Sequence, residues 1–283
     1  MKLAILAFDG LEYDLVERFK LKNIKQRQYG KLSIPEECYT ETRDPRGEKV
    51  YEPWTPYVWS AFLTGKLPTE TGLSKETLVK WDKSALQLLR TFSMKIGLGR
   101  IRNKRKIFEK LGFKRKHFSL EDHKYPTIFS YTKAPRIINV PTVSKGWGVE
   151  LEGKDFNEML GVSWQRFYDI RKETLKSVEG GGWDLLMAYT RLLDIVGELC
   201  FGNFRKLFKA YNVCNEFVGR VKEHLNDNNT ICLVISDHGM ERFGNTSFGR
   251  HSDHAFYSIN ITTSWKPRTI LDFFGQIPDW LAK

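Results

Sequence analysis

The chain has 283 residues, of which 41% are hydrophobic and 28% charged, and its formal net charge is +11. This length suits one large α/β domain or two small ones, and this composition excludes an intrinsically disordered chain. No apolar run reaches the roughly 18–20 residues of a membrane-spanning helix, and the four cysteines, scattered without a C-x-x-C pair, argue against a disulfide framework or a zinc knuckle.

The chain begins with an apolar run, Leu3–Phe8, that ends at the carboxylate of Asp9. A secretory signal needs an apolar region of about 7–15 residues and then a small-residue cleavage site. We therefore expect a buried first strand at this position and a cytoplasmic location.

Further short apolar runs are continuous instead of alternating, which is typical of strands buried on both faces of a mostly parallel sheet. Between them, apolar residues at helical spacing predict helices over Asp155–Val178 and Phe204–Leu225. Strands that alternate with helices predict an open α/β sheet, which binds ligands at the carboxyl ends of its strands. The predicted strands are Leu3–Phe8, Arg136–Val140, Asp184–Tyr189, Thr230–Ile235 and Ala255–Ile261.

Three of these strands are followed by side chains that commonly ligate metals. Asp9 ends the first strand, Asp194 follows the third shortly after its end, and Asp237 and His238 follow the fourth. Each of these residues alone is unremarkable, because Asp is common in turns. Their convergence at one edge of the sheet indicates a metal site.

Residues 53–65 have the pattern of a helix, with Thr55 at the N-cap, Pro56 at the first helical position and Gly65 just after the end. A hydroxyl there lies beside unpaired backbone N–H groups and the positive end of the helix dipole, which attract phosphate. On these residues alone, an ordinary Thr-Pro cap is the favoured interpretation.

Six short blocks, spread in order over most of the chain, resemble motifs of the alkaline phosphatase superfamily. Within it they are most similar to the type I phosphodiesterase/nucleotide pyrophosphatase branch. The block Ser-Asp-His-Gly-Met is quite specific, and the step of nine residues from Thr55 to Thr64 matches the spacing of that branch. The blocks are Phe8-Asp9-Gly10, Thr55-Pro56 with Thr64–Pro68, Ile138–Pro141, Leu193-Asp194, Ser236–Met240, and Gly249-Arg250-His251 before Ala255-Phe256-Tyr257.

The resemblance implies an α/β, alkaline-phosphatase-like three-layer sandwich, with a mostly parallel central sheet and helices on both faces. We expect a single catalytic domain over residues 1–283, with a cap or lid insertion at about 66–135. The implied function is metal-dependent hydrolysis of a phosphodiester or phosphomonoester, with a small phosphate ester or a nucleotide as substrate. Thr55 would be the nucleophile and would form a covalent phosphothreonine intermediate.

The resemblance also implies two divalent metal ions, because two cations neutralise a phosphate ester that otherwise repels nucleophiles. Mixed Asp and His ligands suit zinc or manganese, with iron or magnesium as alternatives. One ion would be held by Asp9, Asp237 and His238 with the Thr55 oxygen alongside, and the other by Asp194, His251 and the residue four positions after Asp194.

That last position departs from the usual pattern, because Glu198 stands where the family usually has His. As a working ligand, Glu198 would favour manganese or magnesium over zinc, since hard cations prefer oxygen ligands. Alternatively, Glu198 points to solvent and the second metal site is weak or lost. Both interpretations stay open at this point.

Nearly all of the net charge belongs to residues 90–117, which hold eleven Lys and Arg residues and one acid, Glu109. Such a segment could lie on an anionic membrane, bind nucleic acid, steer phosphate towards the site, or form a solvated lid. The alternative function is therefore a non-catalytic relative that binds nucleic acid or an anionic membrane through this segment.

Overall fold

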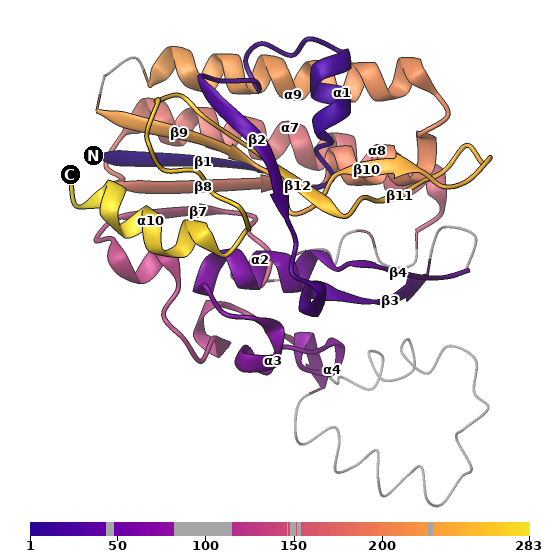
Figure 1. The fold of residues 1–283 in the computed structure, drawn as a ribbon, viewed down its shortest axis with the longest axis horizontal. Coiled ribbons are helices and arrows are strands. Elements are labelled where there is room, and N and C mark those ends of the chain that lie inside the picture. The colour runs from indigo at the N-terminus through magenta and orange to yellow at the C-terminus, as the bar shows by residue number, and fades with distance from the viewer. Residues whose placement is uncertain (44–47, 82–114, 146, 148–150, 152–153, 226–228) are drawn as a thin grey trace, which may run out of the picture.

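The computed structural model describes residues 1–43, 48–81, 115–145, 147, 151, 154–225 and 229–283. Within these residues, the largest sheet has six strands in the order β2-β12-β9-β1-β8-β7, with β1 near the middle (Figure 1). The strands are β1 (Lys2–Phe8), β2 (Gln28–Ser33), β7 (Pro135–Ile138), β8 (Leu185–Thr190), β9 (Thr230–Ile235) and β12 (His254–Ile259).

Four neighbouring strands of this sheet are parallel. Strand β1 pairs with β8 and β9, and β7 pairs with β8, whereas β12 is antiparallel to both β9 and β2. Every residue of β8 and β9 is buried, as their continuous apolar sequences predict. The predicted mostly parallel sheet is confirmed.

Helices cover both faces of the sheet, so the three-layer α/β architecture predicted from the sequence is confirmed (Figure 1). Alternate side chains of β1 point into two separate cores: Leu6 packs in one and Ile5 in the other. The first core is covered by α1 (Tyr13–Arg18), α7 (Phe156–Gly180), α8 (Leu192–Cys200) and α9 (Phe204–His224), and the second by α2 (Thr55–Thr64) and α10 (Asp272–Leu281).

The predicted strands are found within two residues of their expected ends. Strand β7 stops at Ile138 and not at Val140, because Asn139 takes a left-handed backbone conformation with φ of 59° that a strand cannot accommodate. Strand β12 stops at Ile259, two residues before the expected end. The edge strand β2 was not expected, since its sequence has no continuous apolar run and, of its residues, only Gln28 and Leu32 are buried.

Outside the main sheet, the described residues also form three two-stranded ladders. The ladders join β3 (Tyr39–Arg43) to β4 (Lys49–Pro53), β5 (Val79–Trp81) to β6 (Arg115–His117), and β10 (Met240–Arg242) to β11 (Gly249–His251). Short helices in the described part of the chain are η1 (Glu36–Cys38), α3 (Pro68–Thr71), α4 (Lys75–Leu78), η3 (Leu120–Asp122) and η4 (Ile128–Tyr131).

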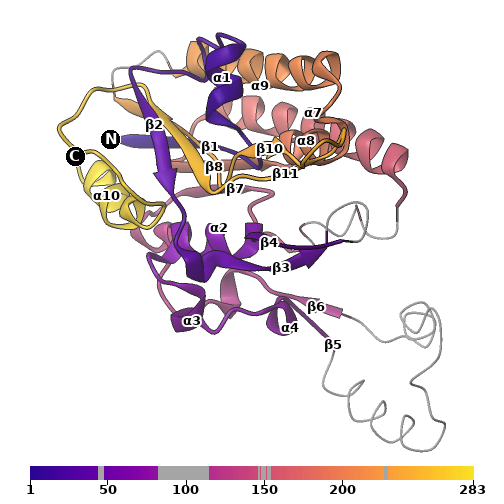
Figure 2. The ribbon, with the colours of Figure 1, turned by 45° about the vertical axis from the view of Figure 1, so that its right-hand side comes forward.

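The expected cap at residues 66–135 is described only in part. Its described ends contain α3, α4, β5 and β6, which lie on the same side of the sheet as α2 (Figure 2). Residues 82–114, and with them most of the basic segment 90–117, lie outside the described residues. Among the residues that the structure does describe, no helix combines the length and the apolar character needed to cross a bilayer.

Candidate active site

The carboxyl ends of three neighbouring parallel strands meet at one edge of the sheet, as the topology requires. Asp9 follows β1, Asp237 and His238 follow β9, and Asp194 lies in the first turn of α8, which follows β8. All four side chains are fully buried. Burying this much charge without water is costly unless the groups are paired or bind a metal.

One group of candidate ligands consists of Asp9, Asp237 and His238. Atom Nε2 of His238 lies 3.1 Å from Oδ1 of Asp9 and 3.5 Å from Oδ2 of Asp237. One ligand atom from each residue lies within 4.8 Å of the other two, which is close enough for all three to surround one ion.

A second group consists of Asp194, His238 and His251, whose ligand atoms also lie within 4.8 Å of one another. Atom Nε2 of His251 is 3.3 Å from Oδ1 of Asp194. The rings of His238 and His251 are stacked with centroids 3.6 Å apart. His238, which we expected to serve one ion only, therefore borders both groups.

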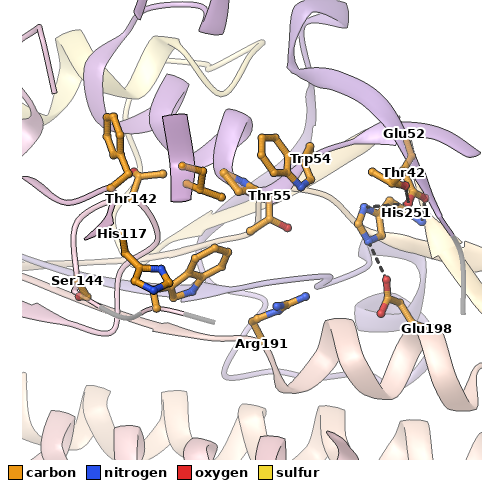
Figure 3. A pocket seen from close by; sticks show the side chains of 14 residues that line it. Thr42, Glu52, Trp54, Thr55, His117, Thr142, Ser144, Arg191, Glu198 and His251 are labelled. Carbon is orange, nitrogen blue, oxygen red and sulfur yellow. Dashed lines mark hydrogen bonds and ion pairs between the residues drawn. The ribbon is translucent and has the colours of Figure 1, made fainter. Parts of the chain in front are cut away.

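Glu198 lies one helical turn after Asp194 on α8, so the two side chains share a face of the helix. Its Oε1 is 3.5 Å from Nε2 of His251, and the side chain faces that ring across the cavity (Figure 3). Glu198 belongs to neither three-residue group, but its carboxylate reaches the second one.

The atoms left without hydrogen bonds fit divalent metals. Both carboxylate oxygens of Asp237, Oδ1 of Asp194 and Nε2 of His251 are buried and have no hydrogen-bond partner. Each such atom costs about 1–3 kcal/mol when it stays unsatisfied. Carboxylate oxygens and imidazole nitrogens are also the ligands that zinc and manganese accept.

Backbone carbonyl groups orient the two imidazole rings. Atom Nδ1 of His238 lies 2.9 Å from the carbonyl oxygen of Gly239, and Nδ1 of His251 lies 2.8 Å from that of Pro53. A proton on each Nδ1, donated to these carbonyls, leaves Nε2 free to bind a metal, the arrangement usual for metal-ligating histidines.

Without a metal, the concentration of acidic groups shifts the pKa values of its members. Burial and the neighbouring Asp9 raise the pKa of Asp237 to about 8. Burial lowers the pKa of His238, but the Asp237 and Asp9 carboxylates together outweigh it and raise the pKa to about 9. Both shifts reflect a lack of positive charge, which a divalent cation would supply.

Thr55 faces the first group. The prediction that Thr55 is the N-cap of its helix was wrong by one residue: Trp54 takes the extended N-cap conformation, and α2 begins at Thr55. The Thr55 side chain is therefore free of a capping role. Its Oγ1 lies 3.4 Å from Oδ1 of Asp9 and 3.4 Å from Nε2 of His238. Gly65 ends the helix in the left-handed conformation, as predicted.

A cavity of about 300 Å³ opens in front of Thr55 (Figure 3). Its walls include the aromatic rings of Trp54 and Trp147, and the end of the described cap contributes His117. Polar side chains, among them Arg191 and Glu198, line the remainder. The cavity thus has an apolar side, formed by Trp54 and Trp147, and a charged side, formed by Arg191 and Glu198. This combination is typical of small-molecule sites.

A sequence profile described as type I phosphodiesterase/nucleotide pyrophosphatase matches residues 3–251 of the chain. The chain belongs to this family. The resemblance seen in the sequence motifs is thereby confirmed.

Individual relatives are more distant. The 2,3-bisphosphoglycerate-independent phosphoglycerate mutase 2 of Methanosarcina barkeri is 28% identical over 72 residues, which are 25% of this chain and only 13% of that protein. The PH0037 protein from Pyrococcus horikoshii is 11% identical, with 99% of this chain and 96% of that one aligned at a TM-score of 0.48. Murine ectonucleotide pyrophosphatase/phosphodiesterase 5 is 14% identical, with 87% and 59% aligned at a TM-score of 0.44. The family assignment rests on the profile match.

Two residues of this phosphodiesterase-family site were not singled out from the sequence. The hydroxyl of Tyr189, at the end of β8, donates a hydrogen bond to Oδ2 of Asp9. The guanidinium of Arg191 lies 3.0 Å from Oδ2 of Asp194 and 3.6 Å from Oδ2 of Asp9. The signal that could have revealed Arg191 is a cation in a mostly apolar run, three residues before the candidate ligand Asp194.

Glu12 was also missed, and it supports the loop after β9. Its buried carboxylate accepts hydrogen bonds from the Met240 backbone at 2.9 Å, from Ser252 Oγ at 3.1 Å and from His254 Nε2 at 3.0 Å. A Cβ atom on Gly239 would lie 2.1 Å from this carboxylate, so the glycine of the Ser-Asp-His-Gly-Met block lets Glu12 approach.

Proposed function

We propose that the chain is a metal-dependent hydrolase of phosphate esters, with Thr55 as its nucleophile and a centre for two divalent ions. The observation that carries this proposal is the position of the Thr55 hydroxyl. It lies in the first turn of a buried helix, 3.4 Å from both Oδ1 of Asp9 and Nε2 of His238, beside two groups of ligand atoms.

The residues divide into two sets of ligands. Asp9, Asp237 and His238 would hold one ion; Asp194 and His251, with Glu198 and the shared His238, would hold the other. When bound, the two ions would neutralise the charge of the phosphoryl group and lower the pKa of the Thr55 hydroxyl.

The remaining steps involve residues of the chain itself. The Thr55 hydroxyl gives its proton to the Asp9 carboxylate, 3.4 Å away, as its oxygen attacks phosphorus and the bond to the leaving oxygen breaks; the leaving oxygen takes a proton from water. The positive end of the α2 dipole, at Thr55, attracts the phosphoryl oxygens. The hydroxide left from that water then attacks phosphorus and breaks its bond to the Thr55 oxygen, which releases phosphate or a phosphomonoester, and Asp9 returns its proton to Thr55.

The cavity supports a small phosphate ester or a nucleotide as substrate. Trp54 and Trp147 offer apolar surface to a ring or alkyl group, and Arg191 adds a positive charge. Glu198 adds an oxygen ligand at the second ion, which favours manganese there, while the histidines suit zinc. The cytoplasmic location stays a prediction.

The test replaces Thr55 in a way that separates chemistry from shape. Thr55→Val keeps the branched side chain and removes the hydroxyl, whereas Thr55→Ser keeps a hydroxyl. The substrates are p-nitrophenyl phosphate and bis(p-nitrophenyl) phosphate, with zinc or manganese added. We expect Thr55→Val to lower the turnover number more than about 100-fold, and Thr55→Ser to keep a substantial part of the wild-type turnover number. Acid-quenched enzyme should carry phosphate on Thr55 by mass spectrometry.

Thr55 is not the nucleophile if Thr55→Val keeps more than roughly a tenth of wild-type turnover. Metal content decides between this proposal and the non-catalytic alternative. Two tightly bound ions per chain support the enzyme, and one or none supports a binding protein.

A further inference from the structure

The carboxylates of Asp9 and Asp194 are held in the same way, although they belong to different ligand groups. In each, Oδ1 faces a histidine: Asp9 faces His238 at 3.1 Å, and Asp194 faces His251 at 3.3 Å. In each, Oδ2 is turned away from the histidine and towards a side chain that is not a candidate ligand. Each Oδ1 is therefore the oxygen that faces the other candidate ligand atoms.

The partners of the two Oδ2 atoms come from one short stretch, 189–191, at the end of β8. Tyr189 donates its hydroxyl to Oδ2 of Asp9. Arg191 donates Nη2 to Oδ2 of Asp194 at 3.0 Å and places Nε 3.6 Å from Oδ2 of Asp9. Among the described side chains that belong to neither group, Arg191 is thus the one that contacts a carboxylate in each group, Asp9 in the first and Asp194 in the second.

Neither partner is free to move away from its carboxylate. The Tyr189 ring is fully buried and packs edge-on against Trp59 at 5.6 Å. The Arg191 guanidinium lies over the ring of Trp147 at 5.7 Å, and its side chain is only 27% exposed. A guanidinium has donors and no acceptor, so it cannot itself ligate a metal.

We propose that Tyr189 and Arg191 are positioning residues of the two-metal centre, an inference that rests on the proposed function. Tyr189 fixes the ligand oxygen of Asp9, and Arg191 fixes that of Asp194. Through its second contact with Asp9, Arg191 also sets the separation of the two groups. The physical reason is that a carboxylate held by one oxygen can turn only slightly, so its other oxygen is preorganised for the ion.

Arg191 has a second effect of opposite sign, because its positive charge repels a cation. The experiment must therefore separate orientation from charge. Tyr189→Phe removes one hydroxyl without changing charge or ring shape. Arg191→Lys keeps the positive charge and loses the planar fork that bridges the two carboxylates.

The experiment titrates zinc, and separately manganese, into metal-stripped full-length protein by calorimetry. We expect wild type to bind two ions. Tyr189→Phe should weaken one binding step by about 10–100-fold, and Arg191→Lys should weaken the other by about 10–100-fold or more, the usual effect of removing an outer hydrogen bond from a metal ligand. The double variant should weaken both steps.

Two matched variants serve as controls. Tyr257→Phe changes a buried tyrosine of β12 that packs against Phe273. Arg166→Lys changes an arginine of α7 that donates to Asn139 Oδ1 at 2.8 Å. Both should bind the two ions as wild type does.

The outcomes separate this inference from the proposed function. Wild type that binds fewer than two ions would overturn both. Wild type that binds two, with Tyr189→Phe and Arg191→Lys within about threefold of it, would overturn the positioning roles alone. A raised KM for Arg191→Lys with unchanged metal affinity would make Arg191 a substrate ligand and refute its positioning role.

Discussion

Gly10 directly follows Asp9, a candidate ligand of the first group, and its backbone lies against that of Asp194, a candidate ligand of the second. It has a left-handed φ of +72°, and a Cβ atom there would lie 2.8 Å from the Cα and 2.9 Å from the backbone nitrogen of Asp194. These contacts are with backbone atoms, which cannot turn aside as a flexible side chain would. Gly10→Ala must therefore displace the start of α8 relative to β1.

The magnitude follows from two costs. A residue with a Cβ atom in the left-handed region costs about 1–2 kcal/mol, and forcing an extra methyl group into a packed site costs about 1–3 kcal/mol. Gly10→Ala should therefore lower the free energy of unfolding by about 2–5 kcal/mol, a large part of the roughly 5–15 kcal/mol of a typical domain. Gly182→Ala is the matched control, because Gly182 has φ of +74° and no neighbouring atom within 4 Å.

In the assay, circular dichroism monitors unfolding in guanidinium chloride with a chelator present. Turnover is measured in separate samples with zinc or manganese added. We expect Gly182→Ala to show only the backbone cost, and Gly10→Ala to exceed it by about 1–3 kcal/mol. Because Asp194 moves with α8, Gly10→Ala should also lose about 100-fold in turnover. Equal destabilisation of the two variants, with the turnover of Gly10→Ala retained, would refute the close-approach argument.

Two further predictions concern charged residues around the site. Glu198→His should keep activity and shift metal preference towards zinc, because imidazole is a softer ligand; an unchanged ratio of zinc-supported to manganese-supported turnover would contradict a ligand role. Burial lowers the pKa of His254, but its hydrogen bond to Glu12, the charge of Glu12 and a hydrogen bond to Asp253 together outweigh this and raise the pKa above 6.5. A raised pKa means that the contribution to stability is full below about pH 6.5 and is lost as pH rises through the folded-state pKa. Guanidinium unfolding of metal-stripped protein should therefore show a loss of stability above this pH that His254→Gln lacks, and parallel curves would show that the pair contributes nothing.

Much of the fold could be predicted from the sequence because it depends on local patterns. Continuous apolar runs identified β1, β8 and β9, since strands buried on both faces have no polar side to interrupt them. The same runs placed Asp9 and Asp237 at strand ends, and parallel pairing puts those ends at one edge. The family motifs then supplied Thr55, and the profile match confirmed the family.

Other features depended on contacts between residues far apart in the chain. Tyr189 reaches Asp9 only because β8 pairs with β1 in a register that places Tyr189 opposite Ala7. Glu12 meets His254 across 242 residues, and nothing near either residue in the sequence indicates it. Local sequence determines which segments are buried and which residues end them. The pairing of the sheet determines which of those ends face each other, and so only the tertiary structure could show that Arg191 bridges Asp9 and Asp194.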